Sequence, residues 1–147
     1  MIPRGLIIAV LIGMIAGAII GVLFVTQKNG DQLLFVQGPS ISIVTDKIDF
    51  ELGEQIKIKI INSGTTSLTF SDASYGLRVT GLDGRVLFSP VAAQVISTLE
   101  PKEEISFVWN QIKNDGDQAA AGTYKIISNA LNDDKMVKKS ITINIHK

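Results

Sequence analysis

Side chains with the chemistry for catalysis or metal binding are sparse in this chain. The one histidine, His146, lies beside the C-terminus, where chain ends usually fray, and no acid or nucleophile stands at a recognisable spacing from it. Cysteine is absent, which excludes thiol catalysis, zinc ribbons, iron–sulfur clusters and disulfides. No glycine-rich phosphate loop occurs either. We therefore predict that the protein is not an enzyme and holds no cofactor or metal.

Residues 114–117 (Asn-Asp-Gly-Asp) are the best candidate for a cation site, because they gather side-chain oxygens. They lack the spacing of a calcium-binding helix–loop–helix and its bidentate glutamate, and Asn, Asp and Gly are also the residues that turns prefer. We interpret this segment, and 132–134 after it, as polar turns. Lys135, Lys138 and Lys139 form a small basic patch, which we interpret as a solvated strand face rather than a contact with lipid headgroups.

The charges of the chain balance, with 14 Lys and Arg against 14 Asp and Glu. Nucleic-acid binding needs clustered cations that displace phosphate counterions, so no nucleic-acid partner is expected. The mildly apolar segment 89–93 (Ser-Pro-Val-Ala-Ala) is expected to be an exposed loop between strands. Binding sites often lie on such loops, although a loop packed over the end of a domain fits the same residues.

Residues 6–25 form an uninterrupted run of uncharged, mostly apolar side chains. A helix of that length spans roughly 30 Å, the thickness of the hydrocarbon core of a bilayer. We predict a transmembrane signal anchor over residues 1–27, a short stalk over 28–39 and a folded domain over 40–147. Arg4 and the amino terminus precede the span and Lys28 follows it near Asp31, so the positive-inside rule favours a cytoplasmic N-terminus and an extracytoplasmic domain.

Three other interpretations of the apolar run stay open. A buried helix of a soluble domain would have to hide apolar side chains on every side. A cleaved signal peptide fits the small residues at 16–18, but the chain continues apolar beyond them. A pilin-like leader fits Arg4 followed by Gly5, although the early glutamate of many pilins is missing.

Gly13, Gly17 and Gly21 recur at four-residue spacing within the apolar run. Small residues on one helix face let two helices approach closely in lipid, so a homodimer through this helix is one hypothesis. The other is that glycine is simply common in membrane helices.

Beyond the stalk, apolar residues alternate with polar ones at the period of β-strands. Turn signals recur about every ten residues and no helical period is present, a pattern typical of an antiparallel immunoglobulin-like β-sandwich. The fold class is therefore all-β, preceded by one transmembrane helix. The expected strands are 40–44, 55–61, 67–70, 77–80, 85–88, 94–99, 105–109, 123–131 and 138–145.

The segments around Phe70, around Trp109 and from Gly122 to Tyr124 resemble domains of the BsuPI type, the intracellular proteinase inhibitor family. The resemblance covers roughly residues 56–131 and implies an immunoglobulin-like fold and the inhibition of a proteinase. Leu87 and Phe88 stand where that family usually has tryptophan. In this reading Trp109 and Tyr124 lie in the core and Gly122 allows a tight turn between their strands.

These patterns together predict a membrane-anchored, extracytoplasmic interaction module that binds a protein partner of the cell envelope. The lipid bilayer is the other predicted partner. A proteinase inhibitor and a pilin-like or filament-associated subunit are the alternatives.

Overall fold

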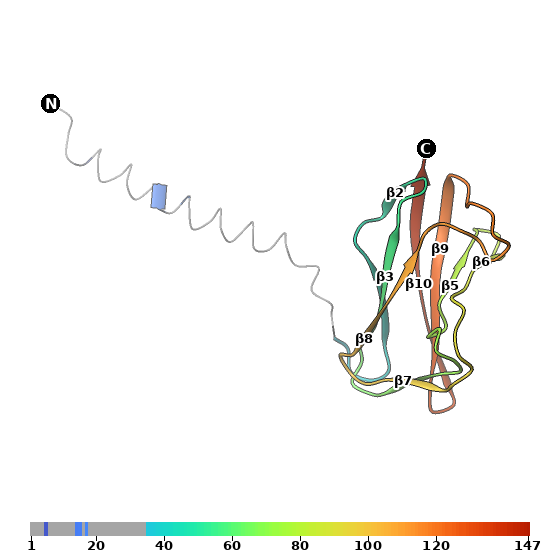
Figure 1. The fold of residues 1–147 in the computed structure, drawn as a ribbon. Helices are drawn as coiled ribbons and strands as arrows, with labels where there is room; N and C mark the ends of the chain where they lie inside the picture. The colour runs from blue at the N-terminus through green and yellow to red at the C-terminus, as the bar shows by residue number, and fades with distance from the viewer. Residues whose placement is uncertain (1–4, 6–13, 16, 18–34) are drawn as a thin grey trace. The chain divides into compact units, whose positions relative to one another are not determined.

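The computed structural model describes residues 5, 14, 15, 17 and 35–147 (Figure 1). The chain divides into two compact units, residues 1–33 and 34–147. The four described residues of the first unit are helical. In the parts of the chain that the structure describes, no helix has the length and apolar character needed to cross a membrane. Most of the predicted span, with Gly13 and Gly21, lies outside the described residues.

The second unit is all-β, as predicted. Its strands are β1 (Ile41–Thr45), β2 (Asp49–Glu51), β3 (Ile56–Asn62), β4 (Leu68–Phe70), β5 (Arg78–Thr80), β6 (Val86–Phe88), β7 (Ser97–Leu99), β8 (Glu104–Trp109), β9 (Gly122–Asn132) and β10 (Lys135–His146).

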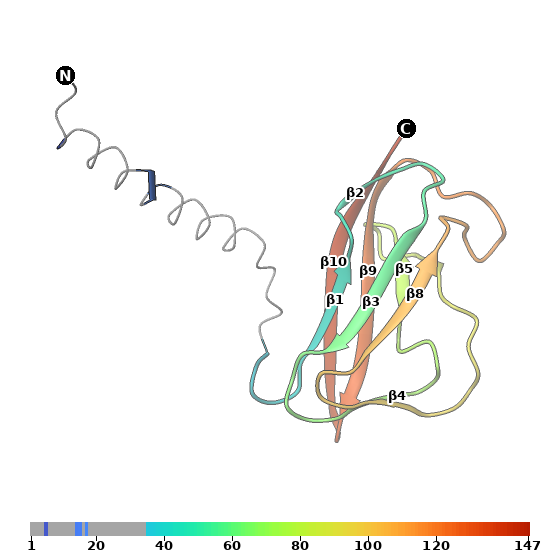
Figure 2. The same cartoon turned by 60° about the vertical axis from the view of Figure 1, so that its left-hand side comes forward.

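The strands form two sheets. One has three strands in the order β1-β3-β8, and Figure 2 shows it in front of the long β9–β10 hairpin. The other has the order β2-β10-β9-β4-β7, and β5 pairs with both β9 and β6. The β9–β10 ladder runs without interruption from the pair Lys135 and Asn132 to the pair Ile145 and Gly122. This hairpin therefore organises the larger sheet.

The hydrophobic core receives alternate residues of the strands. Ile56, Ile58 and Ile60 of β3 are completely buried, whereas Lys57 between them is exposed. Burial of one such isoleucine stabilises a fold by about 1.5–3 kcal/mol, so the alternation fixes which face of the strand points inward. The larger sheet contributes Ile126 and other residues, and the whole core is Ile41, Ile43, Phe50, Ile56, Ile58, Ile60, Leu68, Phe70, Leu77, Val79, Leu99, Trp109, Ala119, Tyr124, Ile126, Ala130, Ile143 and Ile145.

The expected strands 77–80 and 85–88 form an antiparallel hairpin with its turn at residues 81–84. β5 and β6 pair across it, and Gly84 has a φ of 82°, a backbone angle that glycine adopts without steric cost. The strand predicted over 94–99 is too long, because β7 begins at Ser97. β2 was not expected from the sequence, and it pairs with β10 in parallel rather than antiparallel. Only Phe50 of its three residues is buried, so β2 carries almost no periodic signal.

The C-terminal end of the predicted stalk is bound to the β domain. The backbone N–H of Val36 donates to the carbonyl of Ser63 at 2.9 Å, and Gly38 and Thr65 exchange further hydrogen bonds. A Cβ on Gly64 would lie 2.2 Å from the carbonyl oxygen of Gly38, so glycine is required for this close approach. The folded unit thus includes residues from Phe35 onward.

Candidate functional site

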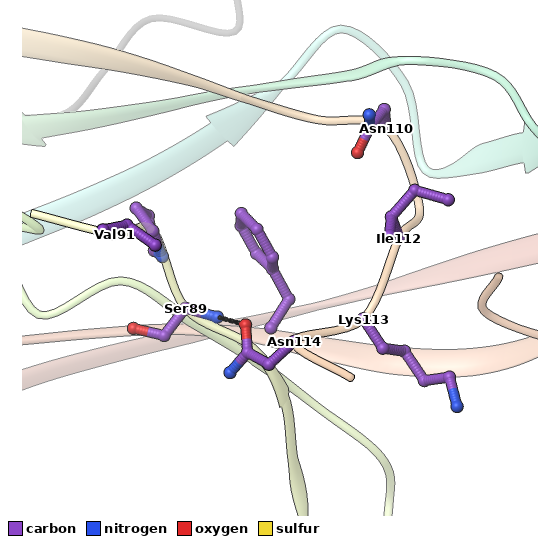
Figure 3. A pocket seen from close by; sticks show the side chains of 8 residues that line it. Ser89, Val91, Asn110, Ile112, Lys113 and Asn114 are labelled. Atoms are coloured by element: carbon purple, nitrogen blue, oxygen red, sulfur yellow. Dashed lines mark hydrogen bonds between the residues drawn. The ribbon is translucent and has the colours of Figure 1, made fainter. Parts of the chain in front are cut away.

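A groove of about 500 Å³ opens at one end of the β domain, between the segments that follow β6 and β8. Figure 3 shows Ser89 and Val91 on one side of it and Asn110, Ile112 and Lys113 on the other. Its lining residues are Phe88, Ser89, Pro90, Val91, Asn110, Ile112, Lys113 and Asn114. Apolar side chains surrounded by a few amides and one cation are typical of a site that receives an apolar group of a ligand or partner.

The groove is in direct contact with the hydrophobic core through Phe88. Its ring stacks on Trp109, with centroids 5.9 Å apart and planes at 23°. Trp109 is completely buried, and its indole N–H donates to the carbonyl of Ile112 at 2.9 Å. The indole of Trp109 thus contacts the ring of Phe88 on one side of the groove and the backbone of Ile112 on the other.

Two hydrogen bonds close the groove at Asn114. Its backbone N–H donates to the carbonyl of Leu87 at 2.8 Å. Its side-chain oxygen accepts from the backbone N–H of Ser89 at 3.1 Å, the contact drawn in Figure 3. These bonds join the segment after β6 to the segment after β8, so the two walls of the groove hold a constant spacing.

Gln111 anchors the wall after β8 to a distant turn. Its side chain is buried, and its amide donates to the carbonyls of Glu51 and Glu54 and accepts from the backbone N–H of Gly53. Its φ of 60° lies in the left-handed region, where a glutamine is uncommon, so the three hydrogen bonds stabilise a conformation that the residue alone disfavours.

The acidic segment 114–117 forms a polar turn, as interpreted from its residues. Asp115 accepts a hydrogen bond from the backbone N–H of Asp117, and the Lys113 ammonium lies 3.2 Å from its carboxylate. The Asp117 N–H first, and Lys113 second, hold the pKa of Asp115 below its usual value. No cluster of three or more potential metal ligands occurs among the described residues.

The segment that links β6 and β7 exposes three large apolar side chains. Val91 is fully exposed, and Val95 and Ile96 are 55% and 78% exposed. The first half of this segment, 89–93, is a loop as predicted, whereas residues 94–96 were expected to be part of a strand. A run of exposed aliphatic residues on one loop is unusual on a monomer surface and typical of a contact site.

Trp109 and Tyr124 lie in the core, with ring centroids 5.9 Å apart in an edge-on arrangement. The Tyr124 hydroxyl donates to the carbonyl of Ala120 at 2.6 Å. The connection between their strands is the long loop 110–121 rather than a tight turn. Gly122 is the first residue of β9 and pairs with Ile145. Gly122 thus begins a strand instead of forming a tight turn, and its φ is 157°.

His146 was expected in a frayed terminus, and this expectation is wrong. It belongs to β10 and pairs with Glu51 of β2, and its Nε2 lies 3.2 Å from the Asp49 carboxylate. Asn144 donates to the same carboxylate oxygen at 2.9 Å. Hydrogen bonds from Asn144 and then from His146 hold the pKa of Asp49 below its usual value. The cluster is exposed and holds β2 in place.

Of the three glycines predicted for helix association, the structure describes Gly17. It is helical and exposed, and a Cβ placed on it would meet nothing within 4 Å. Gly13 and Gly21 lie outside the described residues.

No family model and no curated protein matches this chain. Among solved structures, the sporulation control protein Spo0M of Bacillus subtilis is similar with a TM-score of 0.43 and 11% sequence identity, over 76% of this chain and 51% of that one. A β-glucosidase of Listeria innocua in complex with glucose is similar with a TM-score of 0.38 and 8% identity, over 74% of this chain and 16% of that one. The chain thus spans about half of the first protein and a small part of the second.

Proposed function

We propose that this chain is a membrane-anchored, non-catalytic interaction module with an immunoglobulin-like β-sandwich on the extracytoplasmic side. In this proposal the N-terminal apolar helix holds the chain in the bilayer. The sandwich binds a protein partner of the cell envelope through the groove and the neighbouring apolar loop.

The observation that carries the proposal is the exposure of Val91 in the wall of the groove, and of Val95 and Ile96 further along the same loop. If a partner buried these aliphatic side chains, each one would stabilise the complex by about 1.5–3 kcal/mol. The shape of the groove is held by internal contacts, since Phe88 stacks on the core residue Trp109 and Asn114 of one wall bonds to Leu87 and Ser89 of the other. An anchoring side chain of the partner can enter such a site without ordering it first, which favours binding.

The test is photo-cross-linking of the full chain in its native membranes, with a photoreactive residue at position 91 and mass spectrometry of the products. The proposal expects a defined protein adduct at position 91 and none at the exposed position 83, in the hairpin between β5 and β6. Adducts of equal yield at both positions, or none at either, would contradict it. An additional Ile96→Asp substitution should lower the yield at position 91 at least several-fold.

The anchor is tested separately by extracting native membranes with alkaline carbonate. Retention of the protein in the pellet is the expected result, because a spanning helix withstands the extraction that releases peripheral proteins. Release of the intact chain into the supernatant would refute the anchor. Protection of the β domain from a protease added to the cytoplasmic side would support the proposed orientation, and its digestion would reverse it.

A proteinase inhibitor is the second candidate, and the same loop is the feature that favours it. Val91 follows Pro90 on the loop after β6 and is fully exposed, and an exposed loop is the kind of element that can enter the active-site cleft of a proteinase. A panel of serine proteinases assayed with the detergent-solubilised chain separates the candidates. Dose-dependent inhibition that is lost in Val91→Asp would favour the inhibitor, and full proteinase activity throughout would exclude these enzymes as targets.

A further inference from the structure

The outer edge of β8 has free backbone hydrogen-bonding groups. Asn62 donates to the carbonyl of Glu103, and the register pairs Ile61 with Glu104. Because bonded and non-bonded pairs alternate in an antiparallel ladder, the backbone groups of Glu104, Ser106 and Val108 point away from β3. Within residues 35–147, no hydrogen bond reaches these outward groups. β8 is therefore an unpaired edge strand, at the margin of the smaller sheet in Figure 2.

The side of the core beneath β8 is also open to solvent. Ile58 and Ile60 of β3 are completely buried, but their cross-strand partners Phe107 and Ile105 on β8 are only partly buried. On the outer face of the sheet, Val108 is 55% exposed. A strand added beside β8 would cover these side chains. Burial of apolar surface and backbone hydrogen bonding therefore both favour the addition of a strand at this edge.

The other long edge of the domain carries charges that discourage pairing. By the same alternation, Met136, Lys138, Ser140 and Thr142 of β10 point their backbone groups away from β9. Lys139 is in phase with the core residues Ile141 and Ile143, so it is a charge on the inner face of an edge strand. Inward-pointing charges of this kind block the addition of another strand.

The remaining edges offer less. β2, β6 and β7 have three residues each, and β1, at the other margin of the smaller sheet, lies beside β10 with Ile41 and Ile43 buried. Among the strands that the structure describes, β8 is thus the edge that combines length, free backbone groups and a lack of blocking lysines.

We propose that β8 pairs antiparallel with β8 of a second copy of this chain. One register lets all three outward residues of each strand bond to the partner strand: Ser106 faces Ser106, and Glu104 faces Val108 in both directions. The two three-stranded sheets then become one six-stranded sheet with two-fold symmetry, the commonest symmetry of homo-oligomers. The pairing goes beyond the proposed function, and its failure would leave the groove as a binding site.

The charges along β8 are compatible with this register. Glu104 is neutralised within its own chain by Lys59, with a separation of 2.9 Å. In the paired sheet it lies across from the apolar Val108, whose neighbour on β3 is Lys57. No two like charges face each other across the new ladder. If two β10 edges paired in the register that lets all their outward residues bond, Lys139 would lie opposite Lys139. Like charges that face each other in this way are destabilising.

Because the chain has no cysteine, a single substitution gives an unambiguous cross-linking test. Ser106→Cys places two thiols at the symmetry axis, where facing Cα atoms are about 5.5 Å apart, within the range of a disulfide. The full-length variant in its native membranes should form a disulfide-linked dimer when an oxidant is added. Lys138→Cys on the outward edge of β10 is the matched control and should remain largely monomeric.

A second substitution checks that backbone pairing causes the cross-link. Val108→Pro removes an N–H that points outward and bonds to nothing inside the domain, so the fold should tolerate it as edge strands do. The proposal expects Ser106→Cys with Val108→Pro to lose at least tenfold in dimer yield while the far-ultraviolet circular dichroism of the purified chain stays native.

Four results would overturn the pairing. They are equal cross-linking at positions 106 and 138, no cross-linking at position 106, a cross-link at 106 that persists with proline at 108 in a folded chain, and a disulfide from position 106 to a different protein. The last result would assign the β8 edge to a partner strand instead of a second copy.

Discussion

Phe88 stacks on Trp109 with a centroid separation of 5.9 Å, and this contact makes the groove a continuation of the hydrophobic core. Trp109 is the single tryptophan of the chain and is completely buried, so its fluorescence reports on the folding of the β domain. The fluorescence of Trp109 therefore reports both the stability of the β domain and the contact with Phe88, in the full chain and without labelling.

Phe88→Ala should lower the free energy of unfolding by about 2 kcal/mol, less than a fully buried phenylalanine would cost, because Phe88 is only partly buried. Denaturant titration of the detergent-solubilised chain, followed through Trp109 emission, measures the change. The emission should also shift to longer wavelength in the folded state, since water would reach the indole. An unshifted spectrum would mean that Phe88 does not shield Trp109.

Gln111→Ala should destabilise the β domain by roughly 2 kcal/mol, because it removes the side-chain amide that bonds to the carbonyls of Glu51 and Glu54 and to the N–H of Gly53. Gln118→Ala changes the same residue type at an exposed position of the same loop. It should change stability by less than about 0.5 kcal/mol. Similar denaturation midpoints for the two variants would show that Gln111 does not stabilise the loop.

Gly76→Ala should cost roughly 3 kcal/mol, the sum of a left-handed backbone and a steric clash. Its φ is 63°, and an added Cβ would lie 2.3 Å from the carbonyl oxygen of Asn129. Gly84→Ala provides the control, because Gly84 has a φ of 82° but no atom within 4 Å of the added Cβ. It should cost only about 1 kcal/mol. Thermal unfolding of both variants separates the clash from the backbone term.

Thr80→Val should raise stability by about 1 kcal/mol, since it removes a buried hydroxyl that has no hydrogen-bond partner among the described residues. Thr98→Val replaces the same residue type at an exposed position of β7 and should be nearly neutral. A loss of stability in Thr80→Val would indicate that a water molecule bonds to the hydroxyl in solution.

The Asp49 cluster should make stability depend on pH under acidic conditions. The pKa of Asp49 is lowered in the folded state by Asn144 and then His146, so its contribution is fully present above the unfolded-state pKa, about 3.9. The contribution is lost as the pH falls through the lower folded-state value. The melting temperature of Asp49→Asn should therefore fall less steeply between pH 5 and pH 2 than that of the native chain.

The sequence predicted the strands whose alternation is strong, such as β3 with its three isoleucines and the end of β10. It could not predict β2, because a three-residue strand with one buried side chain has almost no period. The placement of His146 was missed for the same reason, since β2 orders the end of β10 through Asp49.

The groove was only partly predictable. The residues of the segment 89–93 indicate an exposed loop, and the structure adds that the exposure extends to Ile96. Nothing in the sequence brings Ser89 and Asn114 together, because their hydrogen bond depends on how Gln111 and Trp109 fix the long loop after β8. Long-range hydrogen bonds of buried side chains carry no local pattern, so they need the fold to be seen.

The parallel pairing of β2 with β10 has a mechanical consequence. A tension between the segment just before β2 and the carboxyl end of the domain pulls these two strands in opposite directions along the same line. The backbone bonds around Asn144, Ile145 and His146 then share the load at once in shear, instead of opening one after another as in a peeled hairpin. A domain that is anchored at one end and bound to a partner at another point would resist mechanical unfolding through this arrangement.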